Sequence, residues 1–284
     1  MKTSFSHFLP AAVCGLALLL SSCQRGEKDT PTPAAASAEE QEAALSDSYA
    51  QAVYDDALRL AGEAETSAQA SATAVPVSSS CAQVSLDRAA SVLTLDFGTT
   101  GCTGTDGRTR KGKITVAYQG QYRTAGSQTV VTFVSYAVDN NAVGGTVTLS
   151  GVSRNAAGKL QYTVALANGT LTFADGSGTA QAALTRATEW TTGEGTASAQ
   201  DDVFTVTDTG TLTRRSGTTY TIGTPVPLRL QSACLSQGII YPVSGALSFK
   251  TGIKPAFVLD YGSGSCDKTA TLTVGTASQT IALP

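Results

Sequence analysis

Apolar and polar residues alternate along most of the chain beyond residue 80. The two-residue period is clearest in 93–97, 114–118, 160–166 and 218–230. This alternation predicts strands with one buried face and one wetter face, as found in antiparallel sheets. Threonine is frequent at the polar positions, where its β-branched side chain suits the solvated face of a pleated strand.

Turn-forming residues separate these alternating runs at 139–141, 156–158, 175–178 and 215–217. Asn168-Gly169 is the strongest hairpin signal, because both residues tolerate the positive φ of a type I′ turn. We therefore expect an all-β fold of roughly a dozen strands. The strands would form an antiparallel meander that closes as a sandwich or a half-barrel.

One amphipathic helix is predicted before the strands, from about 38 to 61. Ser37 and Glu40 fit a capping box, in which each side chain bonds the other residue's backbone. Apolar residues follow at helical spacing, and these are Leu45, Tyr49, Val53, Ala57 and Leu60. Gly62 stands where a helix commonly ends, and 63–80, rich in Ala, Ser and Thr, has the composition of a linker.

The first residues have the pattern of an export signal. Lys2 is followed by an apolar run over 8–20, which is too short to cross a bilayer comfortably and typical of a secretory signal peptide. Leu20-Ser21-Ser22-Cys23 comes next and resembles the lipobox of bacterial lipoproteins. An ordinary signal peptide followed by a coincidental cysteine is the alternative.

The lipobox resemblance implies that 1–22 is removed as a lipoprotein signal peptide and that the Cys23 thiol carries a diacylglycerol. Two or three acyl chains are enough for stable membrane anchoring. Gln24 follows the cysteine, which resembles a signal for the outer membrane rather than for retention in the inner membrane. The resemblance leaves open whether the protein would face the periplasm or the cell surface.

Charge divides the rest of the chain in two. Residues 24–80 carry three basic and ten acidic residues, whereas 81–284 carries fifteen basic and twelve acidic residues. This change of sign indicates a boundary. We expect an acidic tether over 23–80, including the helix, and a β domain over 81–284.

A short motif occurs twice in the predicted β domain. Leu95-Asp96-Phe97-Gly98 is followed by Cys102, and Leu259-Asp260-Tyr261-Gly262 is followed at the same spacing by Cys266. Each copy also has an upstream cysteine, Cys81 or Cys234. We infer a repeated strand–turn–strand unit with a cysteine at its turn.

These four cysteines are expected to form disulfides if the protein is exported. Four cysteines allow three pairings, and the repeat favours Cys81–Cys102 and Cys234–Cys266. The signal, the acidic helix, the β body and the stretch 96–113 together resemble a group of bacterial lipoproteins. That resemblance implies a location and a fold, with the membrane as a partner through the lipid anchor, and it carries no activity.

The composition excludes several kinds of chemistry. The one histidine, His7, lies in the predicted signal peptide, so triads, Cys–His pairs and His-ligated metals are not expected in the mature chain. The formal charge of −3 gives no reason to expect nucleic acid as a partner. We therefore expect no metal, no cofactor and no catalysis.

The sequence leaves a few candidate binding or catalytic residues. Arg108, Arg110, Lys111 and Lys113 form a basic cluster that could bind an anionic glycan, although strand parity would place two of them on each face. Asp96 and Asp260 could form the acid pair of a glycosidase.

The expected function is that of a lipid-anchored envelope protein of structural or adhesin-like ligand-binding type. Its partner would be a glycan or another envelope protein. A half-barrel carrying a lipid or acyl chain is the main alternative, and the glycosidase is the second.

Overall fold

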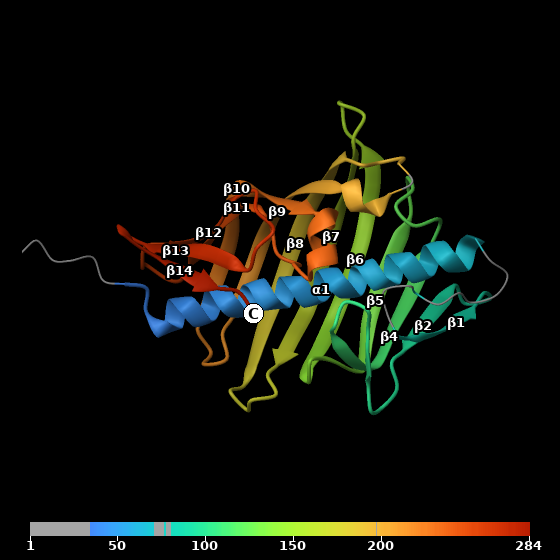
Figure 1. Ribbon diagram of the computed structural model, residues 1–284, viewed down its shortest axis with the longest axis horizontal. Coiled ribbons are helices and arrows are strands. Elements are labelled where there is room, and N and C mark those ends of the chain that lie inside the picture. Colours follow the sequence, from blue (N-terminus) through green and yellow to red (C-terminus); the bar gives the residue numbers. More distant parts are fainter. Residues whose placement is uncertain (1–34, 71–76, 78–80, 197) are drawn as a thin grey trace, which may run out of the picture. The chain divides into compact units, whose positions relative to one another are not determined.

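The computed structural model describes residues 35–70, 77, 81–196 and 198–284, which belong to one compact unit. The predicted signal peptide and the predicted lipidation residue Cys23 lie outside the described residues. A long helix, α1, lies across a large antiparallel sheet (Figure 1).

Helix α1 spans Ala38–Ala70. Its capping box is confirmed: Ser37 Oγ accepts a hydrogen bond from the Glu40 backbone at 3.3 Å, and the Glu40 carboxylate accepts one from the Ser37 backbone at 2.7 Å. The predicted end at residue 61 is wrong. Gly62 lies inside the helix, where a Cβ would lie 2.3 Å from a ring carbon of Tyr122.

The β region forms a single sheet of fourteen strands. The strands are β1 (Gln83–Asp87), β2 (Val92–Asp96), β3 (Cys102–Thr103), β4 (Thr109–Gln119), β5 (Gln128–Val138), β6 (Asn141–Arg154), β7 (Leu160–Thr172), β8 (Thr179–Thr192), β9 (Val203–Thr213), β10 (Thr219–Gln231), β11 (Ser244–Lys250), β12 (Phe257–Ser263), β13 (Thr269–Val274) and β14 (Ala277–Ala282). Two short 3₁₀ helices, η1 (Ala199–Asp201) and η2 (Ser232–Gln237), interrupt them.

The predicted all-β antiparallel meander is confirmed. Strand order follows chain order from β1 to β14, except that β3 pairs only with β4. Strands β1 and β14 each have one neighbour, so the sheet is open. Contacts from β2, β4, β5, β8 and β9 reach α1, so the helix covers the inner face of the sheet.

Irregular residues bend many of the strands. The predicted hairpin turn at Asn168-Gly169 is wrong, because both residues lie inside β7 at a break in its register with β8. Asn168 does have a positive φ of 51°, but it uses this conformation in a β-bulge. On the neighbouring strand, Gly145 has a φ of 114°, and a Cβ there would lie 2.8 Å from the Cα of Gly169. Bulges of this kind strengthen the twist and bend a sheet, which suits a sheet that curves around a helix.

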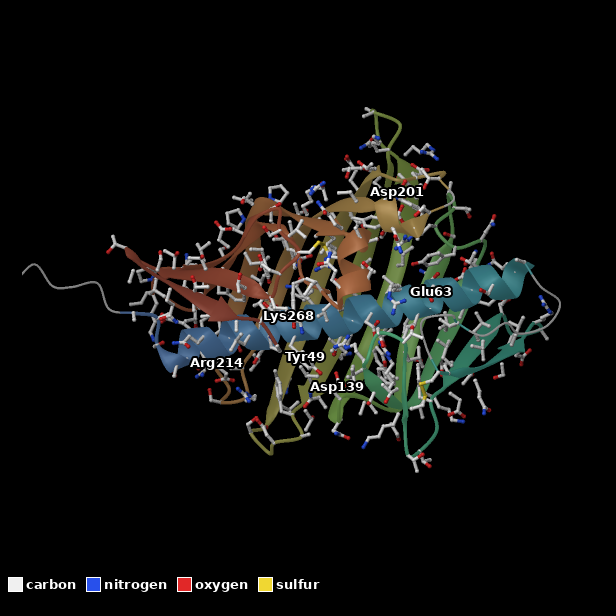
Figure 2. The ribbon with its side chains drawn as sticks, viewed as in Figure 1. Tyr49, Glu63, Asp139, Asp201, Arg214 and Lys268 are labelled. Atoms are coloured by element: carbon white, nitrogen blue, oxygen red, sulfur yellow. A yellow bond between two sulfur atoms is a disulfide. The ribbon has the colours of Figure 1, made fainter. Side chains whose placement is uncertain are left out.

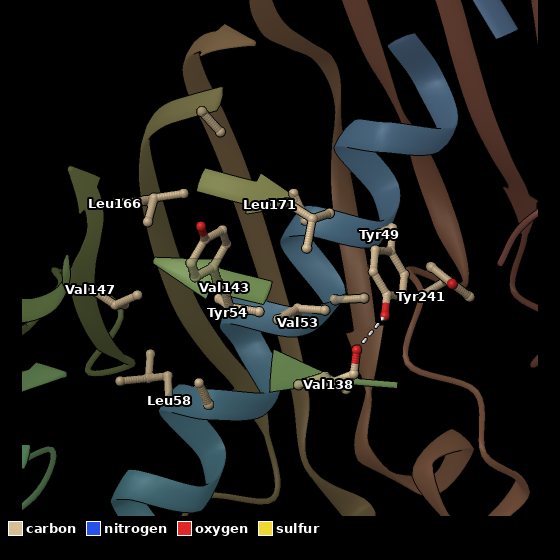
Figure 3. Packing of buried hydrophobic residues seen from close by; sticks show 14 of the residues in the cluster. Tyr49, Val53, Tyr54, Leu58, Val138, Val143, Val147, Leu166, Leu171 and Tyr241 are labelled. Atoms are coloured by element: carbon tan, nitrogen blue, oxygen red, sulfur yellow. Dashed lines mark hydrogen bonds between the residues drawn. The ribbon is translucent and has the colours of Figure 1, made fainter. Parts of the chain in front are cut away.

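The core lies between α1 and the sheet. Tyr49, Val53, Tyr54 and Leu58 of the helix are buried among apolar side chains of the strands (Figure 3). The Tyr54 hydroxyl also donates to the backbone oxygen of Gly144 at 2.8 Å. Most of the other helix residues are buried as well, although a stripe through Asp55, Arg59 and Glu63 stays partly exposed. The predicted tether is therefore, over 38–70, a central part of the core.

Both predicted disulfides are present, Cys81–Cys102 and Cys234–Cys266. In each copy of the repeated motif the bridge joins a residue ahead of a hairpin to the turn that follows the hairpin. The two turns also have the same hydrogen bond: Asp96 Oδ1 accepts from the Gly98 backbone at 2.9 Å, and Asp260 Oδ1 accepts from the Gly262 backbone at 2.7 Å.

Candidate functional site

Four acidic residues of α1 are paired with arginines of the β region. Arg214 follows β9 and lies beside the first turns of the helix (Figure 2). The principal pairs are Arg214 with Glu39 and Glu42, Arg186 with Asp55, and Arg110 with Asp56. The opposite charges of the two parts of the sequence therefore meet across one interface.

The four basic residues expected to bind an anion differ in their burial and in their ion-pair partners. Arg110 is fully buried and its Nη2 lies 2.7 Å from Asp56 Oδ2. Arg108 Nη1 lies 3.7 Å from the same carboxylate. Lys113 is half exposed and bonds Asp96 at 2.8 Å. Three of the four are thus held by a carboxylate of the chain itself, and among the described residues only Lys111 is left for an external anion.

Asp96 and Asp260 act locally, each within its own turn. They lie on β2 and β12, near opposite ends of the strand order. Bonding by Lys113 and by the Gly98 backbone lowers the pKa of the Asp96 carboxyl. A lowered pKa suits a turn cap and not the proton donor of a glycosidase.

A second buried ion cluster surrounds Arg186 of β8. Its Nε lies 2.7 Å from Asp208 Oδ1, and its Nη1 lies 2.6 Å from Asp55 Oδ2. Asp47 is fully buried nearby and accepts a hydrogen bond from Gln51 at 2.6 Å. Burial raises the pKa of the Asp47 carboxyl to about 7, and the neighbouring Asp208 carboxylate adds to this rise.

A cavity of about 30 Å³ lies beside this cluster, between α1 and strands β6–β9. Its lining includes Gln51, Tyr54, Asp55, Leu166 and Arg186. Ligand pockets for drug-sized molecules have about 300–1,000 Å³, so this space suits about one water molecule. An acyl chain would need the volume that α1 fills.

A cluster of aromatic side chains lies farther along the interior, around Arg123. Arg123 belongs to the segment between β4 and β5, and its guanidinium carbon lies over four rings. The distances to the ring centres are 4.9 Å for Tyr122, 5.1 Å for Tyr162, 5.5 Å for Trp190 and 5.2 Å for Phe204. We call these four rings the aromatic cage.

The aromatic cage also contains buried polar atoms. Four buried atoms there have no close hydrogen-bond partner among the described residues, and these are Tyr122 Oη, Arg123 Nε, Trp190 Nε1 and Asp202 Oδ1. Asp202 is only 8% exposed. Burial raises the pKa of its carboxyl, against the opposing effect of the Arg123 charge. Trp190 acts on the same pKa as a hydrogen-bond donor and lowers it, and Arg123 interacts in the same way with Tyr122, so these polar groups face one another.

Sequence reasoning missed both the Arg186 cluster and the aromatic cage. Arg186 and Asp208 lie in strands whose alternation predicts inward positions, and an inward charge is itself a signal for a partner. Arg123 carries no such signal, because it stands in an irregular segment next to Gly120 and Gly126.

Comparison with protein-family models, with curated proteins and with solved structures finds no match to this chain. Across the described residues, no helix combines the length and the apolar character needed to cross a membrane. The same residues contain no group of three or more His, Cys, Asp or Glu side chains placed to hold a metal ion.

Proposed function

We propose that this protein is a lipid-anchored component of the bacterial outer membrane whose β body binds a ligand or partner and performs no catalysis. The observation that carries the proposal is the pairing of all four cysteines of the β body in two disulfides. Disulfides persist in oxidising compartments outside the cytosol. The lipobox-like Leu20-Ser21-Ser22-Cys23 supplies both the export signal and the anchor.

The packing of α1 favours binding at the surface over carriage of a lipid inside the sheet. The helix fills the concave side of the sheet, and the cavity at the Arg186 cluster holds about 30 Å³. A partner, either a glycan or another envelope protein, would therefore meet loops, edges or the outer face. The half-barrel lipid carrier would need α1 to leave.

Mass spectrometry of the N-terminal peptide tests the anchor. The full chain, expressed in a bacterium with an active lipoprotein pathway, should lose residues 1–22 and carry a diacylglyceryl group on Cys23. Cys23→Ala should abolish the modification, whereas Cys14→Ala, which removes the other cysteine of the signal region, should leave it intact. An unmodified Cys23 thiol in the wild type would refute the proposal.

Membrane fractionation tests the predicted location. Wild-type protein should sediment with the outer membrane, and Gln24→Asp should shift it toward the inner membrane. Wild-type protein found mainly in the inner membrane would contradict the assignment, even with Cys23 lipidated.

A further inference from the structure

The connection between β11 and β12 presents an apolar side chain to solvent. We call residues 251–256 the Ile253 loop, because Ile253 is fully exposed and is the most exposed large apolar residue of the described chain. The loop is an ordered turn, in which the Thr251 oxygen accepts a hydrogen bond from the Lys254 backbone at 3.2 Å and Gly252 has a φ of 51°. Turn positions usually carry Gly, Asn, Asp or Ser, so the turn itself does not explain an isoleucine.

Two exposed lysines flank the apolar tip. Lys250 ends β11 and Lys254 follows the isoleucine, and neither lies in ion-pair contact with a carboxylate of the described residues. Arg214 and Arg215 of the neighbouring turn differ, because both bond Glu42 of α1. One exposed apolar residue is common on a protein surface, whereas an apolar tip between two unpaired cations suits an anionic lipid surface. The apolar group enters the boundary between headgroups and acyl chains, and the long basic side chains stay at the phosphates.

The Ile253 loop lies at the end of the β body where the described chain begins. Strand β11 pairs with β10 so that Lys250 is opposite Thr221, which places the loop next to the turn 214–218 between β9 and β10. The first turn of α1 lies at that same turn, since Arg214 Nη2 is 2.9 Å from Glu39 Oε1. The tether predicted to lead to the lipid therefore joins the β body beside this loop.

The length of the tether makes a weak contact sufficient. Residues 24–34 separate Cys23 from the described chain and span at most about 40 Å when extended. A lipid on Cys23 would hold the loop within roughly this distance of the bilayer. A second contact is then intramolecular and acts at a high effective concentration, so one isoleucine and two lysines can keep the β body on the surface.

We propose that the Ile253 loop is a second membrane contact, which docks this end of the β body onto an anionic phospholipid surface. Ile253 enters the headgroup region, and Lys250 and Lys254 lie at the phosphates. The assignment rests on the lipid anchor of the proposed function and adds an orientation to it. The loops at the opposite end of the strands face away from the bilayer and are left for a partner.

A polarity-sensitive fluorophore at the loop tip tests this contact. All four cysteines of the β body are bridged and the lipid would occupy Cys23, so a thiol-reactive nitrobenzoxadiazole dye labels only an introduced cysteine. The full chain with Ile253→Cys is transferred from detergent into vesicles of phosphatidylethanolamine and phosphatidylglycerol. Its emission should be at least twofold brighter there, and at shorter wavelength, than in vesicles of phosphatidylcholine alone, which carry no net charge.

Ala157→Cys is the matched control. Ala157 lies in the exposed turn between β6 and β7, at the opposite end of the antiparallel strands, and it also has basic neighbours, Arg154 and Lys159. Its dye should be equally bright in the two kinds of vesicle. Equal spectra from positions 253 and 157 in the anionic vesicles would overturn the assignment, and so would a signal at position 253 that is equally strong in phosphatidylcholine.

A second label leaves the isoleucine in place. Ala256→Cys, at another exposed position, puts the dye in the same loop, and Ile253→Leu in that background should keep its brightness in the anionic vesicles. Ile253→Asp, and separately Lys250→Gln with Lys254→Gln, should each lose at least half of the increase over phosphatidylcholine. Undiminished brightness in either variant would overturn the assignment. The replaced side chains are exposed, so thermal unfolding should match that of the wild type.

Wild-type protein without an introduced cysteine reports the anchor separately. It should take up no dye, because the lipid occupies the Cys23 thiol, and dye found on Cys23 would refute the anchor. Where Cys23 carries its lipid, the comparison of positions 253 and 157 decides the loop assignment alone. The two proposals can therefore fail independently.

Discussion

At the scale of single residues, Asp47 shows what enclosure by α1 and the sheet does to a carboxyl group. The side chain is fully buried, Oδ1 makes no hydrogen bond, and burial raises its pKa to about 7. An unfolded chain releases this proton near pH 4. The folded state therefore holds a proton that the unfolded state has lost, and stability falls as the pH rises from about 4 to about 7.

Asp47→Asn should remove this dependence, because the amide is neutral at every pH. At pH 8 we expect the variant to unfold at a higher temperature than the wild type. Its free energy of unfolding should be larger by at most about 4 kcal/mol. At pH 5 the difference should be clearly smaller, because most of the loss of stability falls between pH 5 and 7. Thermal unfolding followed by circular dichroism from pH 5 to 8 measures both.

The control for Asp47 is Glu65, whose pKa burial also raises to about 7 although Thr129 donates to it at 2.9 Å. Glu65→Gln should flatten part of the same pH dependence, and the double variant should flatten more. An Asp47→Asn effect of equal size at pH 5 and pH 8 would mean that ionisation of Asp47 does not limit stability.

Gly62 is the second residue with a specific steric role. Alanine is normally favoured over glycine in a helix by about 1 kcal/mol. At position 62 a Cβ would lie 2.3–2.6 Å from the Tyr122 ring and hydroxyl. We expect Gly62→Ala to be destabilising by about 1–3 kcal/mol, measured by urea unfolding. Thr66→Ala compared with Thr66→Gly, at an exposed position of the same helix, gives the ordinary propensity effect, and a stabilised Gly62→Ala protein would contradict the close contact.

At the scale of elements, α1 is held by charge as well as by apolar packing. Arg110 is fully buried and bonds both Asp56 of the helix and Asp106. Removing one partner of a buried pair typically costs about 3–5 kcal/mol, because the other charge is left without compensation. The helix interface should therefore be far more sensitive to loss of a buried arginine than the surface is.

Arg110→Met tests this, since methionine keeps much of the apolar stem. We expect a loss of about 1–3 kcal/mol in the free energy of unfolding, because Arg59 and Arg108 still compensate the charge of Asp56. Arg154→Met removes an arginine that is 57% exposed and paired with Glu194, and it should cost about 1 kcal/mol or less. Urea unfolding compares them, and equal losses would mean that the Arg110 pair contributes no more than a surface pair.

The elements also show how far the sequence predicts this fold. Strand alternation, most turns and the capping box are local patterns, and the structure confirms them. The predicted turn at Asn168-Gly169 is a bulge in the structure. A positive φ occurs in bulges as well as in hairpin turns, and the pairing with neighbouring strands decides which of the two forms. The prediction that the helix ends at Gly62 is wrong for a related reason. The glycine is needed beside Tyr122, a residue far away in the sequence.

The candidate site was harder to predict, because its chemistry comes from contacts between distant segments. The change in charge along the sequence predicted a boundary between the acidic helix and the basic strands. In the structure the same opposite charges attract the two parts to each other. Arg123 meets four rings contributed by different segments. No spacing along the chain encodes that meeting.

At the scale of the whole molecule, the two disulfides brace hairpins near opposite ends of the sheet. Cys81–Cys102 and Cys234–Cys266 close segments of 21 and 32 residues. In the chain-entropy model each bridge contributes about 3–4 kcal/mol. We expect the double variants Cys81→Ser/Cys102→Ser and Cys234→Ser/Cys266→Ser to lose stability by about this amount in urea, whereas no loss in either would show that its hairpin is held by packing alone.

The predicted division places the helix in a tether and the strands in a separate β domain, but the two share one core. Residues of α1 and of the strands form one hydrophobic cluster, and arginines of the strands find their carboxylates on the helix. A fragment of 81–284 would expose the apolar inner face of the sheet and leave Arg110 and Arg186 without their helix partners. We therefore expect the sheet to depend on the helix for its fold.

The fragment 81–284 should consequently lack a cooperative unfolding transition, while a peptide of 35–70 added in trans should restore one. A peptide carrying Asp55→Asn and Asp56→Asn is the matched control and should restore less, because it withdraws the carboxylates from Arg186 and Arg110. Near-ultraviolet circular dichroism and Trp190 fluorescence measure the unfolding transition of the fragment with and without each peptide. A fragment that unfolds cooperatively without the peptide, at the temperature of the full chain, would show that the sheet is a domain in its own right and that α1 is only docked on it.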